Sequence, residues 1–391
     1  MIHLDAAATQ PVRAEVLAAV GPLFTEQFGN PASHHEAGES ASRALEWGRG
    51  VAAKALGVRA SRLIFTSGGT ESNALALHGV ALARPRGRHV LVSAIEHPSV
   101  LRAAEQLGRW HGFEVQTIPV GRSGVVDPAA VAALLRPDTT LVAVMAVNNE
   151  VGTIQPLDEV SALVRACGAR LHVDAVQAGS WLELAPLAAL ADTLALSGHK
   201  LGGLKGAGLL ALGRGVVIEP LLDGGGQEGG LRSGTVNVPG AVSTALAIQA
   251  AQAEVAQFRA AEAPCGEAPG EVVAAVVLGA LSLAGVRAEV TGDASRRVPG
   301  IVSFVFPGLH AESVLIELGR RGVLASSGSA CAAGSSEPSE VLTAMGWDAQ
   351  SAFGALRLSF GPSAPREQLL SAAESVVASV LSVAGIDAAT R

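Results

Sequence analysis

Lysine is scarce in this sequence of 391 residues, since only Lys54, Lys200 and Lys205 are lysine among 28 basic residues. Arginine can take over most charge roles of lysine, but it stays protonated and cannot form a Schiff base. A lysine that is retained inside a motif is therefore a candidate for amine chemistry.

Cysteine is also scarce, with only Cys167, Cys265 and Cys331. Their odd number and wide spacing exclude a disulfide framework and a zinc site of paired cysteines, so at least one thiol should be free. The apolar run at 272–286 is shorter than the roughly 20 residues that a membrane span needs. The first ten residues lack the basic and then apolar pattern of a secretory signal. We expect a cytoplasmic protein without direct membrane contact.

The charge balance gives no basic surplus, because 35 acidic and 28 basic residues leave a net charge of -7. This balance offers no electrostatic footprint for nucleic acid or an anionic membrane, and we expect neither as a direct partner. A hydrophobic content of 49% with 46 glycines describes a dense globular chain. Single cores stop growing at about 250–300 residues, which predicts two packed units.

Short runs of Val, Leu and Ile, each followed by a helical pattern, repeat through the first two-thirds of the sequence. We expect such strands at 62–65, 89–94, 141–147, 171–173 and 193–196. This alternation predicts an α/β fold with a mostly parallel sheet that is buried on both faces. In such sheets the chemistry collects at the carboxyl ends of the strands.

The amino-acid composition changes near residue 260, where an Ala-, Pro- and Gly-rich stretch is typical of a linker. Strands at 301–306 and 356–360 and a helix at 311–320 are expected after it. We predict a large domain at 13–260 and a smaller α/β domain at 261–391, which residues 1–12 join.

Polar residues follow several of the predicted strands. Residues 66–73, Thr-Ser-Gly-Gly-Thr-Glu-Ser-Asn, place small and hydroxyl side chains at a helix N-terminus, which favours an anion such as phosphate. The same residues would also make an ordinary helix cap. His97 precedes Pro98, a residue typical of a first helical position. It could stack on a planar cofactor or only hydrogen bond a loop.

Asp174 ends a short apolar strand, and Gln177 follows it. A buried carboxylate at that place suits the protonated ring nitrogen of a pyridine cofactor. His172 and Asp174 share a strand face and could instead bind a metal, although no third ligand supports this alternative. Lys200 ends another strand beside several glycines, where desolvation would expose its amine as a nucleophile. Lys205 fits a surface loop better.

Cys331 lies in a run of small residues at 326–338, which predicts an exposed and mobile thiol. Cys167 and Cys265 have the ordinary structural interpretation. The adjacent residues at 34–36, His-His-Glu, are interpreted as a polar loop. Residues 224–229 match G-x-G-x-x-G, but they do not follow a clear strand-to-helix transition, so we reject them as a dinucleotide fingerprint.

Together these segments resemble the cysteine desulfurases of the class V aminotransferase family. The resemblance covers nearly the whole chain through ten ordered motifs, at residues 4–9, 29–31, 66–73, 96–97, 147–152, 172–177, 197–200, 224–228, 232–235 and 327–331. It implies a type I fold of pyridoxal-phosphate (PLP) enzymes, PLP as cofactor and a homodimer.

The resemblance also implies roles for single residues. Lys200 would carry PLP as a Schiff base, Asp174 would pair with the ring nitrogen, and Gln177 would contact the ring hydroxyl. His97 would stack on the ring. The phosphate would be held by Gly69, Thr70, Ser197 and His199, with Thr235 from the other subunit. The substrate carboxylate would be held by Asn149 and Arg357, with Asn30 in the same pocket.

The implied reaction converts L-cysteine to L-alanine and leaves a persulfide on Cys331. Lys200 or His97 would move the Cα proton. The sulfur would pass to acceptor or iron–sulfur scaffold proteins, for cluster assembly or tRNA thiolation. Two alternatives stay open: a selenocysteine lyase or other β-eliminating PLP enzyme, and an inactive relative that serves as a binding scaffold. The sequence departs from the family pattern at Ala6, at Gly229 and in the stretch 361–365.

Overall fold

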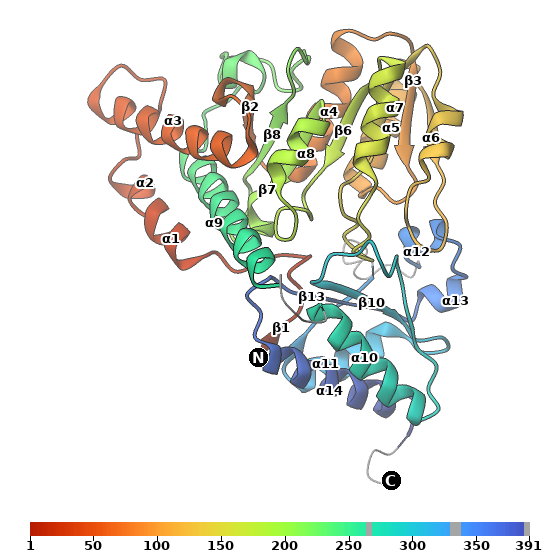
Figure 1. Ribbon diagram of the computed structural model, residues 1–391. Coiled ribbons are helices and arrows are strands. Elements are labelled where there is room, and N and C mark those ends of the chain that lie inside the picture. Colours follow the sequence, from red (N-terminus) through yellow and green to blue (C-terminus); the bar gives the residue numbers. More distant parts are fainter. Residues whose placement is uncertain (263–267, 329–337, 387–391) are drawn as a thin grey trace.

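A seven-stranded sheet forms the centre of the larger part of the molecule (Figure 1). The computed structural model describes residues 1–262, 268–328 and 338–386. The strands follow the order β2 (Leu63–Thr66), β8 (Gly208–Leu212), β7 (Thr193–Ser197), β6 (Arg170–Asp174), β5 (Thr139–Ala143), β3 (His89–Ser93) and β4 (Glu114–Ile118). Strand β8 is antiparallel to both of its neighbours, and the other pairs are parallel. The prediction of a mostly parallel α/β sheet is confirmed.

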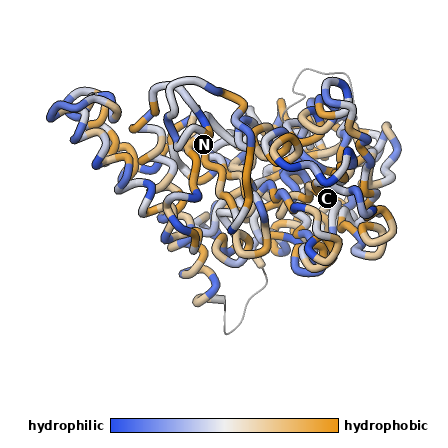
Figure 2. The backbone as a smooth tube through the Cα atoms, turned by 90° about the horizontal axis from the view of Figure 1, so that it is seen from above, coloured by the Kyte–Doolittle hydropathy of each residue, from blue (hydrophilic) through white to orange (hydrophobic). Residues whose placement is uncertain are grey.

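Helices cover both faces of this sheet, because its side chains are apolar on both sides. Ile64, Val90 and Leu141 belong to one core cluster, and Phe65, Leu91 and Val142 belong to another. The first cluster packs under α4 (Gly69–Ala83) and α5 (Pro98–His111). Helices on the other side include α3 (Glu36–Leu56), α7 (Leu157–Cys167), α8 (Leu184–Leu190) and α9 (Val238–Glu262). Coloured by hydropathy, the backbone shows hydrophobic and hydrophilic stretches intermixed throughout the molecule (Figure 2).

The C-terminal part contains a second, antiparallel sheet. Its order is β12 (Ser326–Ser327), β13 (Ala355–Ser359), β10 (Ile301–Val305) and β9 (Glu289–Val290). Three helices pack beside it: α10 (Pro269–Leu283), α11 (Ala311–Arg320) and α14 (Arg366–Val383). The N-terminal strand β1 (Ile2–His3) pairs in parallel with β11 (Val323–Leu324), so the first residues lie against this part (Figure 1). The division at residue 260 stays a prediction, and α9 runs past it.

The remaining helices are short. They are α1 (Ala14–Val20), α2 (Pro22–Thr25), α6 (Pro128–Leu134), α12 (Glu340–Ala344) and α13 (Ala349–Ala352). Within the described ranges, no helix is both long enough and apolar enough to cross a membrane.

Two local predictions differ in part from the structure. In the segment 34–36, His34 and His35 form an exposed polar loop as predicted, but Glu36 is already helical, and His35 Nδ1 caps α3 by accepting the backbone N–H of Gly38 at 3.2 Å. The strand expected at 141–147 is shorter, since β5 ends at Ala143. The reason is that the backbone N–H of Met145 donates to the buried carboxyl of Glu96 at 2.6 Å.

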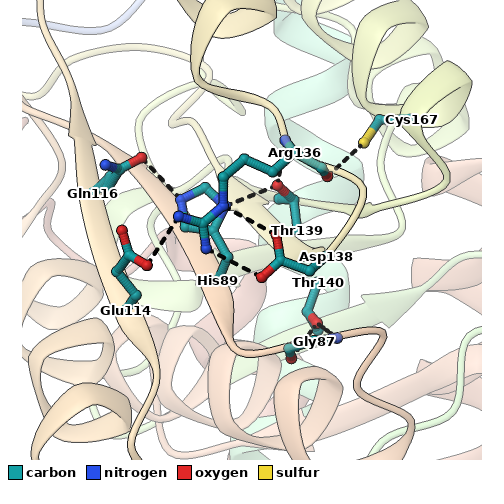
Figure 3. A network of polar contacts seen from close by, with 9 residues as sticks. All are labelled: Gly87, His89, Glu114, Gln116, Arg136, Asp138, Thr139, Thr140 and Cys167. Carbon is teal, nitrogen blue, oxygen red and sulfur yellow. Dashed lines mark hydrogen bonds and ion pairs between the residues drawn. The ribbon is translucent and has the colours of Figure 1, made fainter.

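Polar side chains close the amino edge of the sheet (Figure 3). The buried ring of His89 lies between Thr139 at 2.8 Å and Gln116 at 3.0 Å. Nearby, the thiol of Cys167 donates to the backbone carbonyl of Arg136 at 3.2 Å. Cys167 therefore has a structural contact, and it lies at the edge opposite the strand ends that carry the predicted site.

A buried ion pair fixes the glycine-rich loop near residue 228 to the large sheet. Arg49 Nη2 lies 2.6 Å from Glu228 Oε1, and only 2% of the Glu228 side chain is exposed. The other Glu228 oxygen accepts the backbone N–H of Phe65 at the edge of the sheet. Glu228 has a φ of 50°, an uncommon angle for a residue with a side chain, which shows how strongly these contacts hold the turn.

We expect Glu228→Ala to lower the free energy of unfolding by about 3–5 kcal/mol, because it removes the buried carboxylate partner of Arg49 and leaves only the exposed Glu46 to pair with it. Glu46→Ala is the matched control, since Glu46 pairs with the same arginine but its side chain is 61% exposed. Its loss should stay below about 1 kcal/mol. Urea unfolding of the two variants measures the difference, and equal losses would contradict this account of the loop.

Candidate active site

A cavity of about 370 Å³ lies where the carboxyl ends of β2, β6 and β7 meet the N-terminal segment. It brings together most of the predicted site residues. Those that line it are Gly69, Thr70, His97, Asn149, Asp174, Gln177, Ser197, His199, Lys200 and Arg357. Six further lining residues had no predicted role: Ala7, Ala8, Asn73, Ser99, Met145 and Val176.

Three predicted residues are not placed in this cavity. Asn30 lies in an exposed turn before α3, where its side-chain oxygen accepts the backbone N–H of Ala32, so the expectation that it lines the pocket of its own chain is not met. Thr235 is exposed and also lies away from the cavity of its own chain. Cys331 lies outside the described residues, and so does Cys265.

Lys200 stands directly after β7, at the end of the short 3₁₀ helix Gly198–Lys200. Its amine donates to the backbone carbonyls of Ala7 at 2.6 Å and Ala8 at 2.8 Å. The side-chain amide of Gln177 donates to the same Ala7 carbonyl at 2.8 Å. The N-terminal segment therefore closes one side of the cavity and holds both side chains. Lys205 is exposed, as its surface interpretation predicts.

Asp174 is only 4% exposed, and both of its carboxylate oxygens are hydrogen bonded. Oδ1 accepts the backbone N–H of Val176 at 2.9 Å, and Oδ2 accepts the side-chain amide of Asn73 at 2.7 Å. These two hydrogen bonds satisfy the buried carboxylate group. Asp174 is thus a fixed hydrogen-bond acceptor at the wall of the cavity.

His172 contacts neighbouring polar side chains on both sides of its ring, in place of the metal role that the sequence left open. Its Nδ1 lies 2.9 Å from Thr193 Oγ1, and its Nε2 lies 3.0 Å from Asn73 Oδ1. Complete burial lowers the pKa of His172 to about 3, so its ring is neutral. Within the described residues, no group of three potential ligands could hold a metal ion.

His97 caps α5 and also lines the cavity, and its stacking on a cofactor stays a prediction. Its Nδ1 accepts the backbone N–H of Ser99 at 3.1 Å and lies 2.8 Å from the Ser99 hydroxyl. Pro98 is the first helical residue, as predicted. The ring is therefore held at one edge by the helix that it begins.

The N-terminus of α4 gives the cavity an anion-binding end. The first N–H groups of a helix have no partner within the helix, and the dipole favours negative charge there. A side chain at Gly69 would come within 2.9 Å of Val176, so only glycine leaves the approach open. His199 contributes a neutral ring, because burial, together with the charges of Lys200 and Lys205, lowers its pKa to about 4.

Arg357 is 1% exposed and lies on the side of the cavity formed by the second sheet. Its guanidinium donates to the Asn149 carbonyl at 2.9 Å and to Asp5 Oδ1 at 3.0 Å. Its buried Nε has no hydrogen-bond partner within the described part of the chain. An arginine fork with spare donor capacity suits a carboxylate. Asp5 was only part of a motif in the sequence, and its contact with Arg357 was not predicted.

Two buried acids beside the cavity were also missed. Glu96 Oε1 accepts the hydroxyl of Ser93 and the backbone N–H of Met145, both at 2.6 Å. Burial raises the pKa of Glu96 to about 8. Glu150 accepts the Ser339 hydroxyl at 2.5 Å, and burial raises its pKa to about 7. The sequence pattern did not identify these two acids, because their raised pKa values depend on burial in the folded protein.

Taken together, the cavity fits a flat, anionic, amine-reactive cofactor such as PLP. Lys200 offers the amine, Asp174 faces the interior as a fixed carboxylate, and the start of α4 can bind a phosphate. Arg357 remains for the carboxylate of a second, smaller molecule.

Comparisons with known proteins agree with this geometry. The aminotransferase class-V family model matches residues 2–371. "Putative cysteine desulfurase IscS 1" of Bacillus subtilis (strain 168) is 41% identical over 377 residues, 96% of this chain and 97% of that protein. "Cysteine desulfurase IscS" of Methanosarcina thermophila is 39% identical, over 92% of this chain and 87% of that protein.

Two solved structures are similar over most of their length. A "NifS-like protein" is 34% identical with a TM-score of 0.86, covering 97% of this chain and 99% of that one. "SspA in complex with cysteine" is 31% identical with a TM-score of 0.78, covering 93% of this chain and 99% of that one.

We expect Glu96→Gln to gain stability relative to the parent protein as the pH rises. Because burial raises the pKa of Glu96 from 4.5 to about 8, the folded protein binds this proton more tightly than the unfolded chain. The free energy of unfolding of the parent protein therefore falls as the pH rises from 4.5 to about 8. Glutamine does not ionise, so the variant avoids this loss. Urea unfolding at both ends of the window measures it. Glu105→Gln, on an exposed face of α5, is the control. A Glu96→Gln difference that does not change with pH would contradict the burial argument.

Proposed function

This chain belongs to the class-V aminotransferase family, and we propose that the cavity described above removes sulfur from L-cysteine. Relatives named cysteine desulfurase are 37–41% identical over most of the chain. The protein is a PLP-dependent cysteine desulfurase. The observation that carries the site assignment is that Lys200, Asp174 and Arg357 converge on one cavity from different elements.

PLP would be held by residues that already have fixed positions. Lys200 would bind it as a Schiff base, Asp174 would face the ring nitrogen, Gln177 would contact the ring hydroxyl, and His97 would stack on the ring. When bound, PLP supplies an electron sink for the charge left when a bond at the substrate Cα breaks. The phosphate would lie at the start of α4, with the donors Gly69, Thr70, Ser197 and His199.

L-cysteine would bind through its carboxylate to Arg357 and Asn149. Asp5 contacts one end of the guanidinium, and the Asn149 carbonyl contacts another, so the fork has one orientation. A fixed fork matches a carboxylate by two parallel hydrogen bonds. This side of the cavity therefore suits a substrate with a free carboxylate, as L-cysteine has.

Sulfur transfer would then need a base and a thiolate. Lys200 or His97 would take the Cα proton. The Cys331 thiolate would form an S–S bond with the substrate sulfur while the carbon–sulfur bond breaks. The electron pair of that bond stays with the carbon, which gains a proton to give L-alanine. Ser326, shortly before Cys331, pairs with Arg357 between β12 and β13, and this register supports delivery of the thiol to the substrate.

The persulfide on Cys331 would pass to acceptor proteins, and the IscS names of the relatives favour iron–sulfur cluster assembly. We also propose a cytoplasmic homodimer. The segment from α1 to α3 projects from the body (Figure 1), and its helices and the loop before α3 expose Leu17, Phe24, Phe28 and Trp47, whose exposed fractions range from 55% to 70%. Such an apolar surface marks an interaction site. Thr235 and Asn30 would serve the cavity of the partner subunit.

We expect Lys200→Ala to abolish the visible absorbance of covalently bound PLP and all turnover, because no other amine lines the cavity in the described part of the chain. Lys205→Ala is the matched control and should keep both, since Lys205 is exposed five positions further along the chain. Absorbance spectra of the purified variants with added PLP provide the measurement. A normal cofactor band in Lys200→Ala would contradict the assignment.

Cys331→Ser should keep the cofactor band but lose sulfide release, because it removes the nucleophile and leaves the cavity intact. Mass spectrometry of the parent protein after incubation with L-cysteine should find one extra sulfur on the Cys331 peptide. Cys167→Ser is the control and should behave as the parent does. Full sulfide release by Cys331→Ser would contradict the assignment of Cys331 as the nucleophile. Faster turnover of L-selenocysteine than of L-cysteine would favour a selenocysteine lyase.

A further inference from the structure

A continuous chain of hydrogen bonds runs behind the cavity from Asp174 to His97. Asn73, which is 1% exposed, stands at its centre on the first turns of α4. Its amide nitrogen lies 2.7 Å from Asp174 Oδ2 and 2.9 Å from Ser99 Oγ. The Ser99 hydroxyl in turn lies 2.8 Å from His97 Nδ1. The cofactor-facing carboxylate and the ring-stacking histidine thus share one polar network.

The direction of these hydrogen bonds is fixed at the Asp174 end. The oxygens of the Asp174 carboxylate accept hydrogen bonds, and the Asn73 group that donates to Oδ2 is its NH₂. The Asn73 oxygen then faces His172 Nε2 at 3.0 Å and must accept from it. Burial keeps the His172 ring neutral, so His172 carries its hydrogen on Nε2 and accepts from the Thr193 hydroxyl on Nδ1.

The same direction continues to His97. The second N–H of Asn73 donates to Ser99 Oγ, which leaves the Ser99 hydroxyl hydrogen to donate onward to His97 Nδ1. The backbone N–H of Ser99 donates to the same nitrogen at 3.1 Å, as the cap of α5. Two donors therefore converge on Nδ1, and both act against a hydrogen on that atom.

We propose that Asn73 and Ser99 are positioning residues that fix His97 as the neutral tautomer with its hydrogen on Nε2. Given the proposed function, His97 then meets the cofactor and substrate as a hydrogen-bond donor. Its one basic lone pair points into the Ser99 contacts, so it cannot take the Cα proton without losing the helix cap. Of the two bases left open above, the network favours Lys200.

Nitrogen-15 NMR of protein labelled in its 10 histidines tests the proposal, with His97→Gln identifying the signal. We expect Nδ1 of His97 to be unprotonated and Nε2 protonated at neutral pH, both with and without PLP. The spectrum of the parent protein is sufficient for this test. A hydrogen on Nδ1 of His97, or a doubly protonated His97 ring, would overturn the proposal.

Two variants test the direction of the network. Asn73→Ala removes the donor to Ser99, so that the hydroxyl can reverse and accept from Nδ1, and we expect the second tautomer to appear. Ser99→Ala leaves only the backbone N–H on Nδ1, so the second tautomer should also appear, but to a smaller extent than in Asn73→Ala, where the reversed hydroxyl accepts from Nδ1. The same ratio in Asn73→Ala and the parent would contradict the role of Asn73. These spectra need no turnover, so failure of the desulfurase assignment would be seen separately, as absent sulfide release by the parent protein.

Discussion

A carboxylate that is buried at the end of a parallel strand must be hydrogen bonded. The hydrogen bonds of Asp174 determine how the residues around the cavity are arranged. The backbone of Val176 satisfies one oxygen, and Asn73 satisfies the other. Asn73 can do so only because α4 begins next to the end of β6, where parallel strands place their carboxyl ends together. The same asparagine contacts Ser99 at the start of α5. The hydrogen bonds of one buried carboxylate therefore connect the end of β6, the start of α4 and the start of α5.

The second sheet contributes a carboxylate-binding residue to the cavity at the strand ends of the large sheet. Arg357 lies on β13, opposite the strand ends of the large sheet, and it contacts both Asn149 and Asp5. The N-terminal segment runs between the two parts and accepts hydrogen bonds from Lys200 and Gln177 through Ala7. A carboxylate-binding arginine and a lysine thus come to face one cavity although their sheets are separate. The family departure at Ala6 leaves these backbone contacts in place.

Local patterns predicted the fold and part of the cavity, whereas Asn149 and Arg357 were implied only by the family resemblance. Apolar runs identify buried strands, and the polar residues directly after them, such as Asp174 and Lys200, must lie at the carboxyl edge. The partners of these residues were not predictable in the same way. Asp5 and Arg357 are 352 positions apart, and no periodicity connects them. The Asn73 network and the raised pKa of Glu96 likewise depend on which polar groups meet in the interior.

The most direct test of the account is to locate the cofactor by reducing its covalent link. The purified protein is saturated with PLP, treated with borohydride and digested, and the peptide that carries the phosphopyridoxyl group is identified by mass spectrometry. The account predicts that the label lies on Lys200. Label on Lys54 or Lys205 instead, or no label on any lysine, would contradict a cavity built around Asp174 for PLP.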